Sequence, residues 1–152
     1  MGLFSKLRSG GGAQGSEAYA TAKAVITPAV LAMVADGSVD DAELIQIQNM
    51  CAFSPIFLAI GADQTKKAIH EALDELKTKG AAAAIDASAQ ALSPKLRETA
   101  LCFAIRVTLA DGVLDEGEKT AIIGTAQRLD VPPEVFQKIF DVVVMMQRHA
   151  GV

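Results

Sequence analysis

A short acidic segment occurs twice in this chain, and this repeat constrains the fold more than any other feature of the sequence. Residues 35–43 read Ala-Asp-Gly-Ser-Val-Asp-Asp-Ala-Glu, and residues 110–118 read Ala-Asp-Gly-Val-Leu-Asp-Glu-Gly-Glu. Matching positions such as Asp36 and Asp111 are 75 residues apart throughout. Each copy follows an apolar segment and precedes an amphipathic one. Because two copies are too few for a solenoid, we expect two helix-turn-helix units that pack face to face about a pseudo-two-fold axis.

The remaining sequence predicts helices and lacks the alternating patterns and hairpin turns of strands. Hydrophobic residues make up 51% of the chain but aromatic residues only 5%, so Ala, Leu, Ile and Val must fill the core. Such small side chains suit closely packed helices. We therefore expect an all-α fold, a compact bundle of about seven helices. The predicted helical segments are 17–35 with a kink at Pro28, 41–53, 55–60, 63–79 with Asp63 as N-cap, 81–91, 94–110, 116–129 and 133–149.

The domain organisation follows from the glycines near the N-terminus. Ser9–Gly15 has the composition of a flexible linker. We expect a flexible N-terminal segment over 1–15 and one helical domain over 16–152, with repeat units at about 17–79 and 94–149. No stretch is expected to span a bilayer, since the most apolar one, Ala24–Ala35, is short and contains Pro28. A secretory leader is also missing, which predicts a cytoplasmic protein.

Charge and reactive residues narrow the classes of function. The net charge is −4 and the sequence has no basic stripe, which argues against nucleic acid as a partner and favours cations or basic protein surfaces. Cys51 and Cys102 lie far apart and are expected to be reduced, buried side chains. His70 and His149 are isolated, and no catalytic constellation or phosphate-binding loop is evident. We therefore do not expect an enzyme.

One interpretation of the repeated segment is purely structural. Gly37 and Gly112 stand where a helix ends and the chain needs a left-handed residue. Asp40 and Asp115 suit the N-cap of the next helix, and a glutamate follows each of them three residues later, at the capping-box position. Each cap would contribute about 1 kcal/mol.

The other interpretation is a cation site. The two turns hold eight of the chain's 18 acidic residues, more than capping requires. Asp36 and Asp111 have no capping role, and a carboxylate at a helix C-terminus opposes the helix dipole. Clusters with oxygen ligands alone favour Ca²⁺, Mg²⁺ or Mn²⁺ over Zn²⁺. The loop is not an EF-hand, because glycine is in its second position rather than its sixth.

The paired Ala-Asp-Gly-x-φ-Asp-[Asp/Glu]-x-Glu segments, in which φ is apolar, resemble those of the tellurite resistance protein TerB family, and so does the Met-Gly-Leu-Phe-Ser-Lys-Leu start. The resemblance extends over about Met1 to Ala150. It implies an all-helical fold with internal two-fold symmetry, a role in bacterial tellurite and stress resistance, and association with other Ter proteins at the inner face of the membrane. The acidic cluster that it implies consists of Asp36, Asp40, Glu43, Asp111, Asp115 and Glu118.

Two main hypotheses result. The first is an acidic helical adaptor in tellurite resistance that binds a divalent cation at the paired clusters. The second is an interaction module whose acidic turns serve only as helix caps. A third, weaker hypothesis is reduction of tellurite by Cys51 and Cys102, whose apolar neighbours should make both thiols inert.

Overall fold

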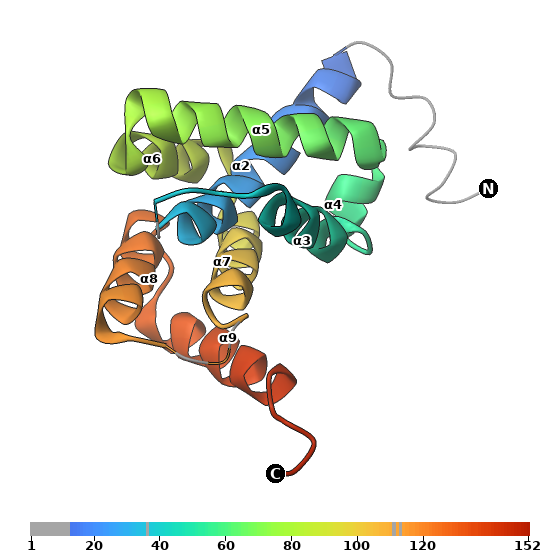
Figure 1. Cartoon of the computed structure of the whole chain (residues 1–152). Coiled ribbons are helices and arrows are strands. Elements are labelled where there is room, and N and C mark those ends of the chain that lie inside the picture. Colours follow the sequence, from blue (N-terminus) through green and yellow to red (C-terminus); the bar gives the residue numbers. More distant parts are fainter. Residues whose placement is uncertain (1–12, 36, 111, 113) are drawn as a thin grey trace, which may run out of the picture.

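The protein is an all-α domain in the computed structural model, which describes residues 13–35, 37–110, 112 and 114–152 (Figure 1). Eight helices and no strand are found in these residues, where the sequence predicted about seven helices. The helices are α2 (Ala13–Val34), α3 (Asp41–Cys51), α4 (Pro55–Leu58), α5 (Gly61–Lys79), α6 (Ala81–Ala91), α7 (Pro94–Thr108), α8 (Glu116–Arg128) and α9 (Pro133–Met146).

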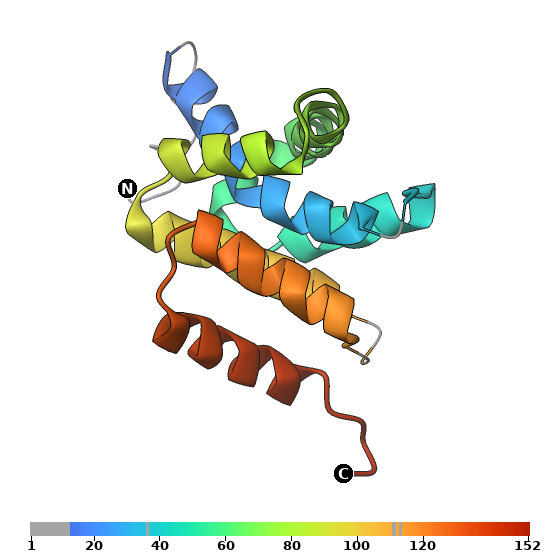
Figure 2. The same ribbon diagram turned by 90° about the vertical axis from the view of Figure 1, so that its left-hand side faces the viewer.

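Helices α2 and α7 form the centre of the domain and pack against each other more extensively than any other pair of described helices. Helices α5 and α6 pack on α2, whereas α8 and α9 pack on α7 (Figures 1 and 2). The side chains of Ala22, Ala29, Ala100 and Ala104 on the two central helices are 0% exposed. These small side chains allow the helix axes to approach closely. The two acidic turns follow these two central helices directly.

Helix α2 corrects one expectation from the sequence. By length and composition, its Gly15–Val34 segment is long and apolar enough to cross a bilayer, contrary to our prediction that no such stretch exists. This segment contributes core residues, however, and Val25, Ile26 and Val30 are 0% exposed within the protein. Its Lys23 forms an ion pair with Glu75 of α5. These contacts support the interpretation of α2 as the central helix of the domain.

Two helix starts also differ from the predictions. Helix α2 begins at Ala13, three residues before the expected start of the domain, and it continues through Pro28. Helix α5 begins at Gly61, so Asp63 is not its N-cap and lies inside its first turn. The reason is that Ile60 still donates its backbone N–H to the carbonyl of Phe57 at the end of α4, and Gly61 then changes the chain direction with φ of 83°.

Candidate functional site

The two glycines of the repeated segment adopt the left-handed conformation that the sequence predicted. Gly37 has φ of 110° and Gly112 has φ of 78°. The N–H of Gly37 donates to the carbonyl of Val34 at 2.9 Å, and that of Gly112 donates to the carbonyl of Leu109 at 3.0 Å. Both glycines thus end the preceding helix in the same way and aim the chain toward the next one.

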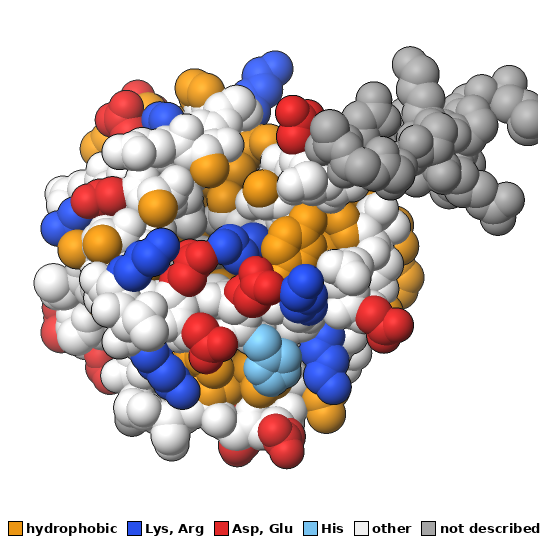
Figure 3. Space-filling view, turned by 90° about the horizontal axis from the view of Figure 1, so that it is seen from above, with side chains coloured by type: hydrophobic (Ala, Val, Ile, Leu, Met, Phe, Trp, Pro, Cys, Tyr) orange, Lys and Arg blue, Asp and Glu red, His pale blue; other side chains and the backbone are white. Residues whose placement is uncertain are grey.

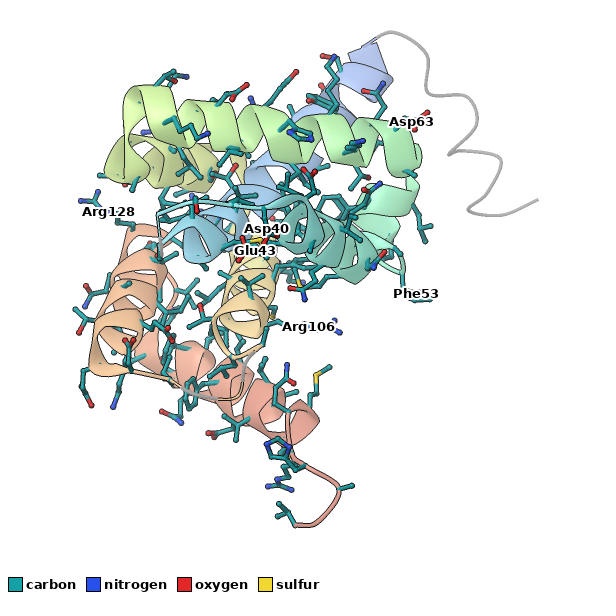
Figure 4. All side chains as sticks on the ribbon, viewed as in Figure 1. Asp40, Glu43, Phe53, Asp63, Arg106 and Arg128 are labelled. Atoms are coloured by element: carbon teal, nitrogen blue, oxygen red, sulfur yellow. The ribbon has the colours of Figure 1, made fainter. Side chains whose placement is uncertain are left out.

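The aspartates that follow cap α3 and α8. Asp40 Oδ1 accepts from the N–H of Glu43 at 2.8 Å, and Glu43 Oε2 accepts from the N–H of Asp40 at 3.1 Å, which completes a capping box. Asp115 Oδ1 accepts from the N–H of Glu118 at 2.7 Å. The predicted capping roles of Asp40, Glu43 and Asp115 are therefore confirmed. The labelled Asp40 and Glu43 lie side by side in Figure 4.

The six predicted cation ligands can be followed only in part. Asp36 and Asp111 lie outside the described residues. Within the part of the chain that the structure describes, no three His, Cys, Asp or Glu side chains gather closely enough to hold a metal ion. What the structure does bring together is one glutamate from each turn, Glu43 and Glu118, which line the same cavity.

This cavity is open to solvent, has a volume of about 680 Å³, and lies between the ends of α2 and α7 and the helices α3 and α8. Most of its lining residues form eight pairs whose members are 75 positions apart, as a pseudo-two-fold arrangement of two units would produce. The pairs are Leu31 and Arg106, Ala32 and Val107, Met33 and Thr108, Ala35 and Ala110, Glu43 and Glu118, Gln46 and Ala121, Ile47 and Ile122, and Met50 and Thr125. Cavities of this size are typical of ligand sites.

The cavity is lined by apolar side chains together with the charged Glu43, Glu118 and Arg106. Ile47 and Ile122 are 1% and 4% exposed and come from equivalent places on α3 and α8. The half-buried Glu43 and Glu118 supply carboxylates. Arg106 is exposed and its side chain extends outward from α7 (Figure 4). The arrangement can therefore bind an apolar group that carries positive charge.

Sequence reasoning found the carboxylates of this site but not its apolar walls. Leu31, Met33 and Val107 belong to the helices before the turns, and Met50 belongs to the helix after the first turn. Extending the 75-residue register from the acidic segment into its flanking helices would have identified these residues as equivalent positions. Three of these four residues match a polar or charged residue in the other unit, so residue type alone does not reveal the equivalence.

The two cysteines are free, but their surroundings differ from the expectation. Cys51 is buried as predicted, and burial raises the pKa of its thiol to about 12. Cys102 is exposed, so the prediction of burial was wrong for this residue. The buried face of α7 carries Leu101 and Ile105, one turn apart, and Cys102 points away from it. Desolvation and the carboxylate of Glu98 raise the pKa of Cys102 as well, so neither thiol is activated for attack on an oxyanion.

Surface charge on the face over α5 is mixed in sign. Lys and Arg side chains alternate there with Asp and Glu (Figure 3). The exposed residues of α5 include Lys66, Lys67, Asp74 and Lys77, together with His70. This face does not present the basic stripe that a nucleic acid backbone would need.

Comparison with known protein families places most of the chain in one of them. The family model described as tellurite resistance protein TerB matches residues 22–140, which include both acidic turns and the helices α3 to α8. Searches of curated proteins and of solved structures found no match.

Proposed function

Because the chain belongs to the tellurite resistance protein TerB family, we propose that it is an acidic helical binding protein of bacterial tellurite resistance, with the cavity between its two repeat units as the binding site. One observation carries the proposal. The same cavity is lined by Glu43 and Glu118, and its other walls are also built from residues 75 positions apart. Helix capping in two repeated turns does not by itself require that both turns line one cavity.

A divalent cation is the first ligand of the proposed site. Its donors would be the six carboxylates Asp36, Asp40, Glu43, Asp111, Asp115 and Glu118. Asp36 and Asp111 directly follow Ala35 and Ala110, which line the cavity. Carboxylate oxygens are suitable ligands for Ca²⁺, Mg²⁺ or Mn²⁺. A bound cation would also offset the cost of placing acidic residues after the C-termini of α2 and α7.

The cation proposal predicts a specific loss of binding. Titration of the wild-type chain with Ca²⁺, Mg²⁺ and Mn²⁺ in a calorimeter should show saturable binding. The Asp36→Asn/Asp111→Asn variant should weaken the affinity at least about tenfold, or about 1.4 kcal/mol. The matched control is Asp41→Asn/Glu116→Gln, which removes the same charge from the exposed first residues of α3 and α8, neither of which lines the cavity. Binding of equal strength in all three proteins would contradict the cation site.

The proposed partners are other tellurite-resistance proteins, including a membrane component, and the proposed location is the cytoplasm with peripheral attachment at the inner membrane. The acidic turns support attachment through a protein. The cytoplasmic leaflet of a membrane is anionic and attracts basic rather than acidic segments.

The alternative function is an interaction module in which the turns are caps and no metal binds. It is favoured by the complete capping box at Asp40 and the cap at Asp115. Asp40→Ala and Asp115→Ala should each lower the free energy of unfolding by about 1 kcal/mol, whether or not divalent cations are present. Thermal unfolding with added Mg²⁺ or with a chelator measures this, with Asp41→Ala as the control. A loss of stability only in the presence of Mg²⁺ would show that capping is an inadequate account.

A further inference from the structure

Two methionines line the cavity between the repeat units. The chain has five methionines, and four of them are Met33, Met50, Met145 and Met146. Met33 and Met50 line the cavity, and Met145 and Met146 directly precede Gln147, which also lines it. Flexible, polarizable thioethers adapt to the shape of a partner and are frequent on surfaces that accept different helices.

Exposed apolar side chains also lie on α9, the helix that Gln147 of the cavity directly follows. Val142 and Met146 are one turn apart on this helix and are 50% and 58% exposed. Met145, also on the last turns of α9, is 49% exposed. The buried face of α9 is instead carried by Val143, which is 5% exposed. These exposed apolar side chains lie beside the face of α9 that packs on the domain, and Gln147, which follows the helix, lines the cavity.

The surroundings of the cavity are acidic. The first turns of α3 and α8, with their caps, carry six carboxylates, at Asp40, Asp41, Glu43, Asp115, Glu116 and Glu118. Two of these six, Glu43 and Glu118, line the cavity, and so does one cation, the exposed Arg106. An acidic rim around an apolar interior is complementary to an apolar face bordered by positive charges.

The volume of the cavity fits side chains rather than a whole helix. One turn of an α-helix with its side chains occupies roughly 400–600 Å³, from a diameter of 10–12 Å and a pitch of 5.4 Å. About 680 Å³ would therefore accept the apolar side chains from one face of a helix that lies across the opening. Such a helix would present anchors at positions i, i+3, i+4 and i+7.

We propose that the cavity binds a basic amphipathic helix of a partner protein. Its apolar face would enter the cavity between Ile47 and Ile122, and its Lys or Arg residues would lie near Glu43 and Glu118. This inference rests on the proposed function and names the class of partner for the same site. The acidic rim disfavours an anionic membrane surface, which would be repelled.

The test uses a fluorescein-labelled, 18-residue peptide of Leu and Lys with helical amphipathic spacing as the probe. Fluorescence anisotropy should show saturable binding to the full chain. The affinity should fall at least tenfold in Glu43→Gln/Glu118→Gln and in Ala121→Trp, which fills the cavity from an exposed lining position. The control variant Asp63→Asn/Asp74→Asn loses the same charge on α5, outside the cavity, and should change the affinity less than threefold. Thermal unfolding checks that each variant is folded.

Several results would overturn the inference. These are equal binding of a peptide with Glu in place of Lys, equal binding of a scrambled peptide without amphipathic spacing, unchanged binding in the cavity variants, or binding of phosphatidylglycerol vesicles in place of the peptide. Survival of cells on tellurite, compared between the wild-type chain and Ala121→Trp, distinguishes failure of the proposed function from failure of the basic-helix inference. If survival is lost but the wild-type chain does not bind the Lys peptide, the proposed function stands and the basic helix is wrong. If the peptide binds in the cavity but survival is unchanged, the role in resistance is wrong.

Discussion

Replacement of Leu101 by Ala is expected to lower the free energy of unfolding by about 2–5 kcal/mol. Leu101 is 0% exposed and lies on α7, the central helix that packs against α2, α8 and α9. Truncation removes buried apolar surface and leaves a cavity that the surrounding helices can fill only in part. Urea denaturation followed by far-UV circular dichroism measures the change, and the slope of the transition should stay the same.

The neighbouring residue provides the control. Cys102 is on the same helix but exposed, so Cys102→Ala should change the stability by no more than about 0.5 kcal/mol. A Leu101→Ala variant that loses less than about 1 kcal/mol would show that α7 is not the centre of the core. The paired measurement therefore tests the packing of the domain rather than the helix propensity of α7.

The sequence predicted well those features that depend on interactions between residues close together in the chain. Gly37 and Gly112 adopt positive φ, and Asp40 and Asp115 cap the next helix, because each geometry depends on a glycine or an aspartate at one fixed offset. The start of α7 after Ser93 follows from the same kind of local signal. Helix class and most helix starts were therefore predictable, whereas most predicted C-terminal ends were one to three residues too long.

The features that the sequence did not predict depend on contacts between distant segments. The composition of Gly15–Val34 is apolar enough for a bilayer as well as for a protein core. Only the packing of α2 on α5 and α7 distinguishes a membrane-spanning helix from a core helix. Asp63 is a good cap by type, but α5 already begins at Gly61 after the turn that follows α4, so its N-cap position is Ile60. The burial of Cys51 and the exposure of Cys102 depend on the faces that α3 and α7 turn inward.

The candidate site illustrates both cases. The capping box at Glu43 is local and was predicted, whereas the meeting of Glu43 and Glu118 at one cavity is a consequence of how α2 and α7 pair. The repeat suggested that the two turns would face each other. It did not show that apolar side chains such as Met50 would form the wall between them.

Replacement of Ala29 by Leu is expected to lower the free energy of unfolding by about 1–3 kcal/mol, because added methylene groups strain a core that is already filled. Ala29 on α2 is 0% exposed and belongs to the same buried cluster as Ala100 on α7. The matched control is Ala83→Leu on α6, where the side chain is exposed and the change should be within about 0.5 kcal/mol.

The same substitution links the core to the cavity. Leu31 and Met33, which line the cavity, lie within four residues of Ala29 on α2. A larger side chain at position 29 should move this end of α2 relative to α7 and so change the spacing of the cavity walls. We expect Ala29→Leu to weaken binding of the Leu–Lys peptide, while Ala83→Leu leaves the affinity unchanged. If the two variants are equal in stability and in affinity, the small buried residues do not determine the spacing of α2 and α7.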